Sequence, residues 1–155
     1  IISASLDITE RKRVEEALRE RSEVLHAIFD HIPVMLCFID QTGRMKLANR
    51  EFERVFGWTL AEIRRHPDIF AEWYPDPDYR AGVLAFIRKS TGKFAEFQTR
   101  TRSGAVIPTS FANVFLADGT SIGIGLDITE RKRAEESLTL FRNLIQRERL
   151  SDSGL

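Results

Sequence analysis

Three histidines and one cysteine are the side chains of this 155-residue sequence that most often bind metals or take part in catalysis. His26, His31, His66 and Cys37 do not stand at the spacing of a metal-binding motif. The sequence also lacks a glycine-rich phosphate loop and a recognisable nucleophile motif. We therefore predict neither a metal site nor a catalytic site, and we expect that this chain is not an enzyme.

A tyrosine followed by an arginine offers a different chemistry. Tyr79 and Arg80 stand just after two aspartates, Asp76 and Asp78. A guanidinium presents a planar fork of N–H donors that matches a carboxylate, so Tyr79 and Arg80 are candidates for binding a carboxylate ligand. The alternative is that Arg80 pairs with Asp76 or Asp78 on the surface.

The charge balance is even, with 23 basic and 23 acidic residues. Such a chain has no basic footprint for nucleic acid and no attraction to anionic lipid. No apolar run approaches the roughly 20 residues that a membrane-spanning helix needs, and the first residues do not resemble a signal peptide. A single cysteine fits a reducing compartment. We predict a cytoplasmic fragment without membrane contact, which is compatible with a membrane anchor elsewhere in a longer protein.

A near-identical segment occurs twice and sets the domain organisation. Residues 6–18 read LDITERKRVEEAL and residues 126–138 read LDITERKRAEESL, an offset of 120 residues that indicates tandem modules. The residues just before each copy alternate apolar with small side chains, as a strand does. We predict the end of the last strand of a preceding module (1–7), a linker helix (8–24), one domain (25–128), and an exit helix that leads into a next module (129–155).

The linker helix is predicted to begin at the capping signal Asp7 to Glu10. Its apolar residues follow a four-then-three spacing that Arg21 interrupts; they are Val14, Leu18, Leu25, Ile28 and Ile32. This spacing indicates a coiled-coil seam and hence a homodimer, although an amphipathic helix lying on its own domain is the alternative. We expect pairing in the first half of the helix and docking onto the domain from Leu25 to Ile32.

Residues 25–128 alternate between strand and helix signals. Strands are predicted at 34–39, 44–48, 93–102, 105–116 and 120–128, with short helices from Asn49 and Thr59 and a longer helix from Asp76. The first strand is a continuous apolar run, which predicts burial on both faces. Ser103-Gly104 and Asp118-Gly119 are hairpin signals. This order predicts an α+β fold with a five-stranded antiparallel sheet and helices on one face.

The element order and several short motifs resemble the PAS family of sensor domains. The motifs are Asn49 at the first short helix, Gly57-Trp58-Thr59, Arg102-Ser103-Gly104, and the exit segment 126–132 with its PAC-like sequence. The resemblance implies a half-open sheet around a small-molecule pocket, with Asp127 and Thr129 fastening the last strand to the outgoing helix for signal transfer. Capping of that helix alone is the alternative role for these two residues.

The resemblance also implies which side chains line the pocket. The inward positions predicted on the strands and helices are Cys37, Ile39, Phe70, Trp73, Tyr79, Val83, Phe86, Phe97, Thr99, Ser110 and Ala112, with Arg80 beside them. For each of these residues, plain core packing is the alternative to ligand contact.

The sequence leaves the identity of a cofactor unknown. Haem-binding members of the family use a histidine on the long helix, and residues 76–91 contain none, so haem is not expected. Light sensors that form a flavin adduct need a cysteine in the helical segment, whereas Cys37 is in a predicted strand, which excludes the adduct. Non-covalent flavin stays open.

The resemblance implies a non-catalytic sensory module of a bacterial multidomain signalling protein, such as a two-component histidine kinase or a diguanylate cyclase. Its expected partners are a second copy, neighbouring PAS modules, a downstream output domain and a small-molecule ligand. The alternative is a ligand-free dimerisation and spacer module in a tandem array. A cavity with convergent polar groups would favour sensing, and a core closed by Trp73, Phe86 and Phe97 would favour the spacer.

Overall fold

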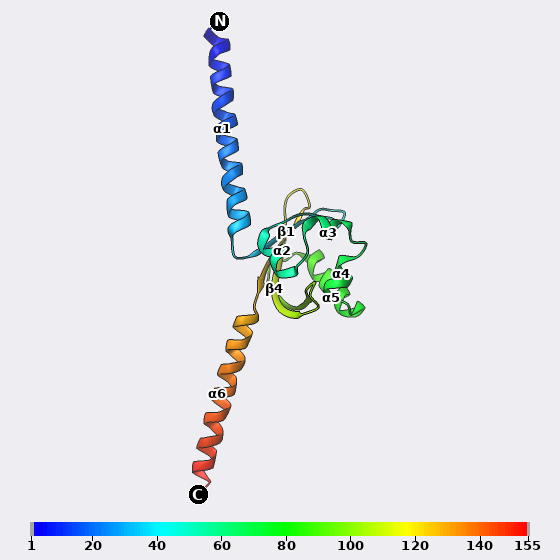
Figure 1. Cartoon of the computed structure of the whole chain (residues 1–155), viewed down its shortest axis with the longest axis vertical. Helices are drawn as coiled ribbons and strands as arrows, with labels where there is room; N and C mark the ends of the chain where they lie inside the picture. The colour runs from blue at the N-terminus through cyan, green and yellow to red at the C-terminus, as the bar shows by residue number, and fades with distance from the viewer. Residues whose placement is uncertain (1, 155) are drawn as a thin grey trace.

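A five-stranded sheet with helices on one face carries a long helix at each end (Figure 1). The computed structural model describes residues 2–154, with side chains from residue 7 onward. The helices are α1 (Ile2–His31), α2 (Arg50–Phe56), α3 (Leu60–Arg65), α4 (Ile69–Trp73), α5 (Pro77–Lys89) and α6 (Thr129–Ser153). The strands are β1 (Met35–Ile39), β2 (Met45–Ala48), β3 (Ala95–Arg100), β4 (Val106–Phe115) and β5 (Ser121–Asp127). The predicted α+β class and strand count are confirmed.

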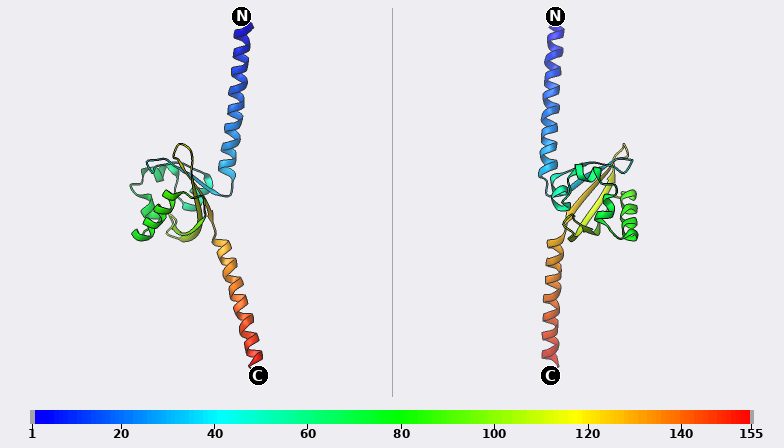
Figure 2. Two further views of the ribbon diagram at one scale, coloured as in Figure 1. Left: turned by 180° about the vertical axis from the view of Figure 1, so that it is seen from behind. Right: turned by 45° about the vertical axis from the view of Figure 1, so that its right-hand side comes forward.

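The strands lie in the order β2-β1-β5-β4-β3, and all neighbours are antiparallel. Helices α2 to α5 cover one face of this sheet (Figure 2). The core lies between these helices and the sheet, and is built from side chains such as Met35, Phe52, Phe56 and Trp73. The N-terminal and C-terminal strands β1 and β5 are adjacent, so α1 and α6 leave from neighbouring parts of the sheet.

The predicted helix caps are present in the structure. Asn49 accepts a hydrogen bond from the Phe52 N–H at the start of α2, and Gly57 ends that helix with a left-handed φ of 78°. Thr59 and Glu62 form a reciprocal capping box on α3. Asp76 caps α5, whose first residue is a proline. These local signals therefore fix where the helices on the core face begin.

Strand β1 corrects one expectation about burial. Met35, Cys37 and Ile39 are buried, whereas Leu36 and Phe38 between them are only half-buried. The run is apolar throughout because Phe38 contacts Phe29 of α1 on the outer face, at 5.9 Å between ring centroids. The strand is thus covered fully on the helical face and only partly on the other.

The prediction of a strand at residues 1–7 is wrong for residues 2–7, which are the first turns of α1; Ile1 lies outside the described residues. The predicted cap at Asp7 is wrong for the same reason, because the helix already runs through this position. A strand is stable only when neighbours complete its hydrogen bonds, and the sheet here pairs β1 to β5 with one another. The origin of residues 1–7 in a preceding module stays a prediction.

The expectation that Leu25 to Ile32 docks onto the domain is wrong for most of the segment. Leu25 and Ile28 stay exposed, at 65% and 55% of their surface, and only Phe29, Asp30 and Ile32 are partly covered. Helix α1 projects away from the domain, and α6 projects in the opposite direction (Figures 1 and 2). The apolar seam of α1 therefore has no partner among the residues that the structure describes.

Candidate functional site

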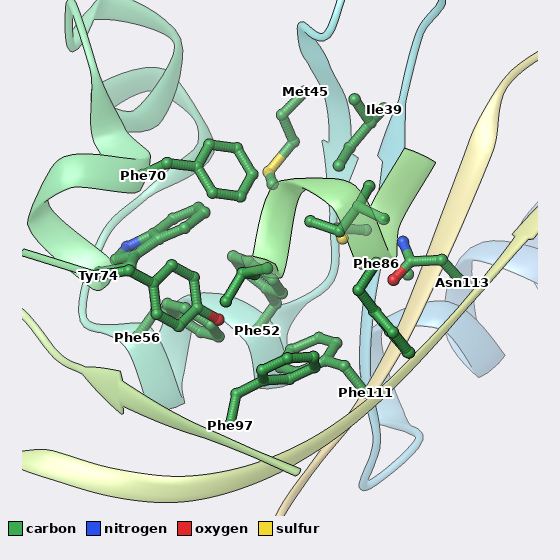
Figure 3. A pocket seen from close by; sticks show the side chains of 15 residues that line it. Ile39, Met45, Phe52, Phe56, Phe70, Tyr74, Phe86, Phe97, Phe111 and Asn113 are labelled. Atoms are coloured by element: carbon green, nitrogen blue, oxygen red, sulfur yellow. The ribbon is translucent and has the colours of Figure 1, made fainter. Parts of the chain in front are cut away.

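A small cavity lies inside the core, between the sheet and helices α4 and α5 (Figure 3). Its volume is about 40 Å³, which is room for on the order of three water molecules. Its lining comprises Cys37, Ile39, Met45, Phe52, Phe56, Phe70, Trp73, Tyr74, Val83, Phe86, Ile87, Phe97, Phe111, Asn113 and Gly123. No charged side chain is among them, so the cavity suits an uncharged molecule or the apolar part of a larger one.

Seven of the predicted pocket residues line this cavity: Cys37, Ile39, Phe70, Trp73, Val83, Phe86 and Phe97. Thr99 is fully buried beside it, where its hydroxyl lies 3.2 Å from the Tyr74 hydroxyl and 2.8 Å from the Thr109 hydroxyl. Whether any of these residues contacts a ligand stays a prediction.

The predicted inward positions on β4 are wrong by one residue. Ser110 and Ala112 alternate with Phe111 and Asn113, and it is the latter two that line the cavity. Pairing with β3 sets this phase, because Phe97 lies opposite Thr109 and inward side chains share a face across the pair. Both phases of β4 contain small and apolar residues, so alternation alone could not choose between them.

Tyr79 and Arg80 do not reach the cavity. The Tyr79 hydroxyl accepts a hydrogen bond from the Gln98 N–H on β3, and the residue is 41% exposed. Arg80 donates to the Tyr74 carbonyl oxygen at 3.0 Å, at the end of α4, and pairs with neither Asp76 nor Asp78. The predicted pairing of Arg80 with Asp76 or Asp78 is therefore wrong, because its guanidinium satisfies a carbonyl group left free by the end of a helix. Carboxylate binding by Tyr79 and Arg80 stays a prediction.

One end of the cavity is polar. The Asn113 side-chain N–H donates to the Ser121 hydroxyl at 3.3 Å, and Ser121 lies 3.4 Å from the Ser90 hydroxyl. Figure 3 shows the carboxamide of Asn113 at the edge of the cavity, with its oxygen turned toward Phe86. Asn113 thus places a carboxamide, which has both donor and acceptor atoms, in the lining of the cavity. The sequence contained no signal for this role beyond a polar residue within an apolar strand.

Aromatic rings close the rest of the space. Phe86 and Phe97 meet edge to face at 5.1 Å, and Phe56 packs on Phe52 at 4.3 Å. The indole N–H of Trp73 is buried without a hydrogen-bond partner, an unusual and costly state for a donor. The site is therefore a tightly packed aromatic core with little spare volume.

Glycines on β5 make room for the lining side chains. A methyl group at Gly123 would approach the Cys37 sulfur to 2.7 Å, and one at Gly125 would approach the Phe111 ring to 2.3 Å. Side chains at these two positions would thus force the neighbouring residues into the cavity. The alternation of isoleucine with glycine in β5 is the sequence feature that corresponds to this need for positions without a side chain.

The Cys37 thiol should react slowly with Ellman's reagent. Burial raises its pKa to about 12, against a weaker lowering by a hydrogen bond from the Gly123 backbone. At about pH 8 we expect the folded chain to react on the order of a thousandfold more slowly than the chain in denaturant, since the thiolate is the reacting form. Its rate should keep rising toward pH 11, and a plateau near pH 9 would contradict this.

The residues of the cavity do not fit a haem or a flavin-cysteine adduct. No histidine lines it, α5 contains none, and the Cys37 sulfur lies on β1 beside Gly123. Within the part of the chain that the structure describes, no cluster of three or more His, Cys, Asp or Glu side chains could hold a metal ion. The cavity is therefore a candidate for a small molecule that binds without covalent or metal chemistry.

The junction between β5 and α6 is held by two sets of contacts. The Asp127 carboxylate accepts hydrogen bonds from the Thr129 N–H at 2.9 Å and from its hydroxyl at 2.5 Å. Glu96 of β3 pairs with Arg131 at 2.6 Å and with Lys132 at 2.7 Å. Asp127 and Thr129 thus fasten the start of α6, and Glu96 ties its first turn to the edge strand β3. Sequence reasoning missed Glu96, because a contact over 35 residues leaves no local pattern.

Comparison with known proteins identifies the family to which this architecture belongs. The sequence profile described as the PAS fold matches residues 29–133, about two thirds of the chain. The chain belongs to the PAS family. The match begins at the end of α1 and ends within the first turns of α6, so it contains the whole sheet and the exit junction.

Relatives of this PAS domain include sensor proteins. Sensor protein FixL of Bradyrhizobium diazoefficiens is 30% identical over 168 residues, covering 96% of this chain and 31% of that protein. The chain thus spans about a third of this relative. The PAS domain of an HTR-like protein from Haloarcula marismortui is 22% identical, with a TM-score of 0.59 over 76% of this chain and 99% of that one.

A second similar structure is a domain of a sensory box sensor histidine kinase/response regulator from Geobacter sulfurreducens. It is 23% identical, with a TM-score of 0.58 over 71% of this chain and 96% of that one. These two structures establish the fold. Among the described residues of the PAS domain and its flanking helices, no helix has the length and apolar character to cross a membrane.

Proposed function

We propose that this PAS domain is a non-catalytic, cytoplasmic sensory relay. In this proposal, occupation of the core cavity or binding of a partner shifts the sheet. The sheet passes this shift to α6 and to a downstream output domain. The observation that carries the proposal is the attachment of α6 to β3 through Glu96, because β3 also bears Phe97 in the cavity wall. Adjacent residues of one strand thus contact the cavity and the exit helix.

The flanking helices support assembly as a parallel homodimer. Val14, Leu18, Leu25 and Ile28 are exposed on α1, and the offset of 120 residues places Leu138, Phe141 and Ile145 in the same register on α6. Phe141 takes the position that Arg21 interrupts on α1, so the seam on α6 runs without a break from Leu138 to Ile145, although Glu148 replaces Ile28 at the next position. Pairing of these helices would convert a shift of the sheet into rotation of the neighbouring PAS modules and output domain.

The ionic attachment has a defined pH dependence. Hydrogen bonding to Lys132, followed by the charges of Lys132 and Arg131, lowers the pKa of Glu96 below its usual 4.5. A carboxylate with a lowered folded-state pKa stabilises the attachment above about pH 4.5 and loses this contribution as the pH falls through the folded value. The contribution of Glu96 to holding α6 on β3 is therefore fully present at neutral pH.

Replacing Glu96 with glutamine should loosen the start of α6. We expect amide hydrogen exchange of residues 132–137 to become several-fold faster, because the charge pairing that holds this turn is removed. Exchange in β4 and β5 should stay unchanged. Glu130→Gln is the matched control, since Glu130 lies in the same turn and is exposed without an ion pair. Equal effects of the two variants would show that Glu96 does not attach the helix.

A ligand-free spacer is the second candidate function. The edge-to-face packing of Phe86 on Phe97 and the cavity of only 40 Å³ favour it. The buried indole N–H of Trp73, which lines the cavity without a hydrogen-bond partner, favours sensing, because a permanently filled core leaves few polar groups without partners. Both functions use the same attachment of α6, so the two differ only in whether the cavity is occupied.

A further inference from the structure

A surface cleft shares a wall with the core cavity. The cleft lies between the β1–β2 hairpin and helices α3 and α4, and its volume is about 200 Å³. Ile39, Met45 and Phe70 line both spaces, so one layer of side chains separates them. Figure 3 shows these three residues along one edge of the cavity. Met45 is buried, and the unbranched methionine side chain changes rotamer easily, which suits a movable part of the wall.

The lining of the cleft changes from apolar to cationic. Ile63, Ile69 and the three shared residues form its apolar part, and Arg44, Arg64 and His66 form its basic part. The cleft contains one acid, Asp68, whose carboxylate accepts a hydrogen bond from the Ala71 N–H. A carboxylate oxygen of Glu72 in α4 lies 3.7 Å from the His66 Nε2, so an acidic group already stands beside that ring. The two arginines are therefore the cleft's available positive charges.

Both guanidinium groups are free. Residues 35–127 contain nine arginines, of which six donate side-chain hydrogen bonds within the structure. The three without a partner are Arg44, Arg50 and Arg64, and two of these line the cleft. Guanidinium groups pair readily with carboxylates, so two unpaired guanidinium groups on one cleft form a candidate binding site for an anionic head group.

We propose that this cleft and the core cavity together bind an amphiphilic carboxylate. The carboxylate pairs with Arg44 and Arg64, and the apolar chain passes Met45 toward Phe86 and Val83. The proposal deepens the proposed sensory function, on which its signalling consequence rests, by naming the ligand class. In this proposal, Arg44 and Arg64 provide the carboxylate recognition that the sequence predicted for Tyr79 and Arg80.

Isothermal titration with octanoate and with 1-octanol tests the proposal on the complete chain. Octanoate should bind to the unaltered chain. The double variant Arg44→Gln/Arg64→Gln should lower the affinity for octanoate by at least about tenfold and leave the affinity for 1-octanol unchanged. Arg50→Gln is the matched control, since Arg50 is equally free and does not line the cleft. Equal weakening by Arg50→Gln, or no weakening by the double variant, would overturn the assignment of the head-group site.

Chain length tests whether the ligand reaches the core. Affinity should rise up to about fourfold per methylene from butyrate to octanoate, because each added group leaves water for an apolar wall. Amide resonances of Cys37 and Asn113 should shift with octanoate and not with butyrate. A flat chain-length series, or no binding of octanoate at millimolar concentration, would overturn the proposal. Neither result would affect the attachment of α6 by Glu96, which is measured without ligand.

Discussion

Replacing Asn49 with alanine should lower the free energy of unfolding by about 3 to 4 kcal/mol, among the largest effects of any single change in this domain. Asn49 is fully buried, and its side-chain oxygen accepts from the N–H groups of Leu36 and Phe52. Its side-chain nitrogen donates to the carbonyl oxygens of Phe29 and Val34. Alanine leaves four backbone groups without this partner, and unfolding in urea measures the loss.

Two further substitutions make the Asn49 result specific. Asn49→Ser keeps an oxygen able to cap α2 and should recover about 1 kcal/mol relative to alanine. Asn143→Ala removes an asparagine from the exposed face of α6 and should change the stability by less than about 0.5 kcal/mol. If Asn49→Ala were as mild as Asn143→Ala, the four hydrogen bonds would not be holding α1, β1 and α2 together.

Replacing Phe56 with alanine should cost about 4 kcal/mol. The ring is 2% exposed and stacks on Phe52 at 4.3 Å, with the Trp73 ring at 4.8 Å and the Phe111 ring at 6.1 Å. Removing it enlarges the cavity and takes away aromatic contacts worth more than their buried area. Urea unfolding followed by tryptophan fluorescence measures the change.

Phe115→Ala is the matched control for Phe56, because Phe115 stands at the end of β4 with 53% of its surface exposed. It should lower the stability by less than about 1 kcal/mol. A loss at Phe56 no greater than this would mean that the aromatic cluster reorganises around the missing ring, and that the cavity wall is less well packed than the ring geometry indicates.

Features that depend on neighbouring residues were predictable from the sequence. The caps at Asn49, Thr59 and Asp76 each need a side chain and a backbone group within one turn, so residue type and spacing identify them. The hairpins at Gly104 and Gly119 follow from the same local logic, and both glycines have positive φ angles. The fold class then followed from the order of the elements.

Features that depend on partners distant in sequence were not predictable. The phase of β4 is set by pairing with β3 and β5, so Phe111 and Asn113 were missed in favour of Ser110 and Ala112. Arg80 was matched to nearby aspartates, although a carbonyl group freed by the end of α4 was the better acceptor. At residues 2–7 the strand pattern was overridden, because the described sheet pairs only β1 to β5 and these residues continue α1 instead.

The central claim is that the state of the cavity reaches α6 through β3, and xenon tests it without knowledge of the natural ligand. Xenon enters small apolar cavities, and this one is lined almost wholly by apolar side chains. Amide NMR spectra under xenon pressure should show shifts at Cys37 and Asn113 and also at Glu96 and residues 129–135. In Glu96→Gln the cavity shifts should persist and those in α6 should disappear. Shifts confined to the cavity of the unaltered chain would contradict the relay.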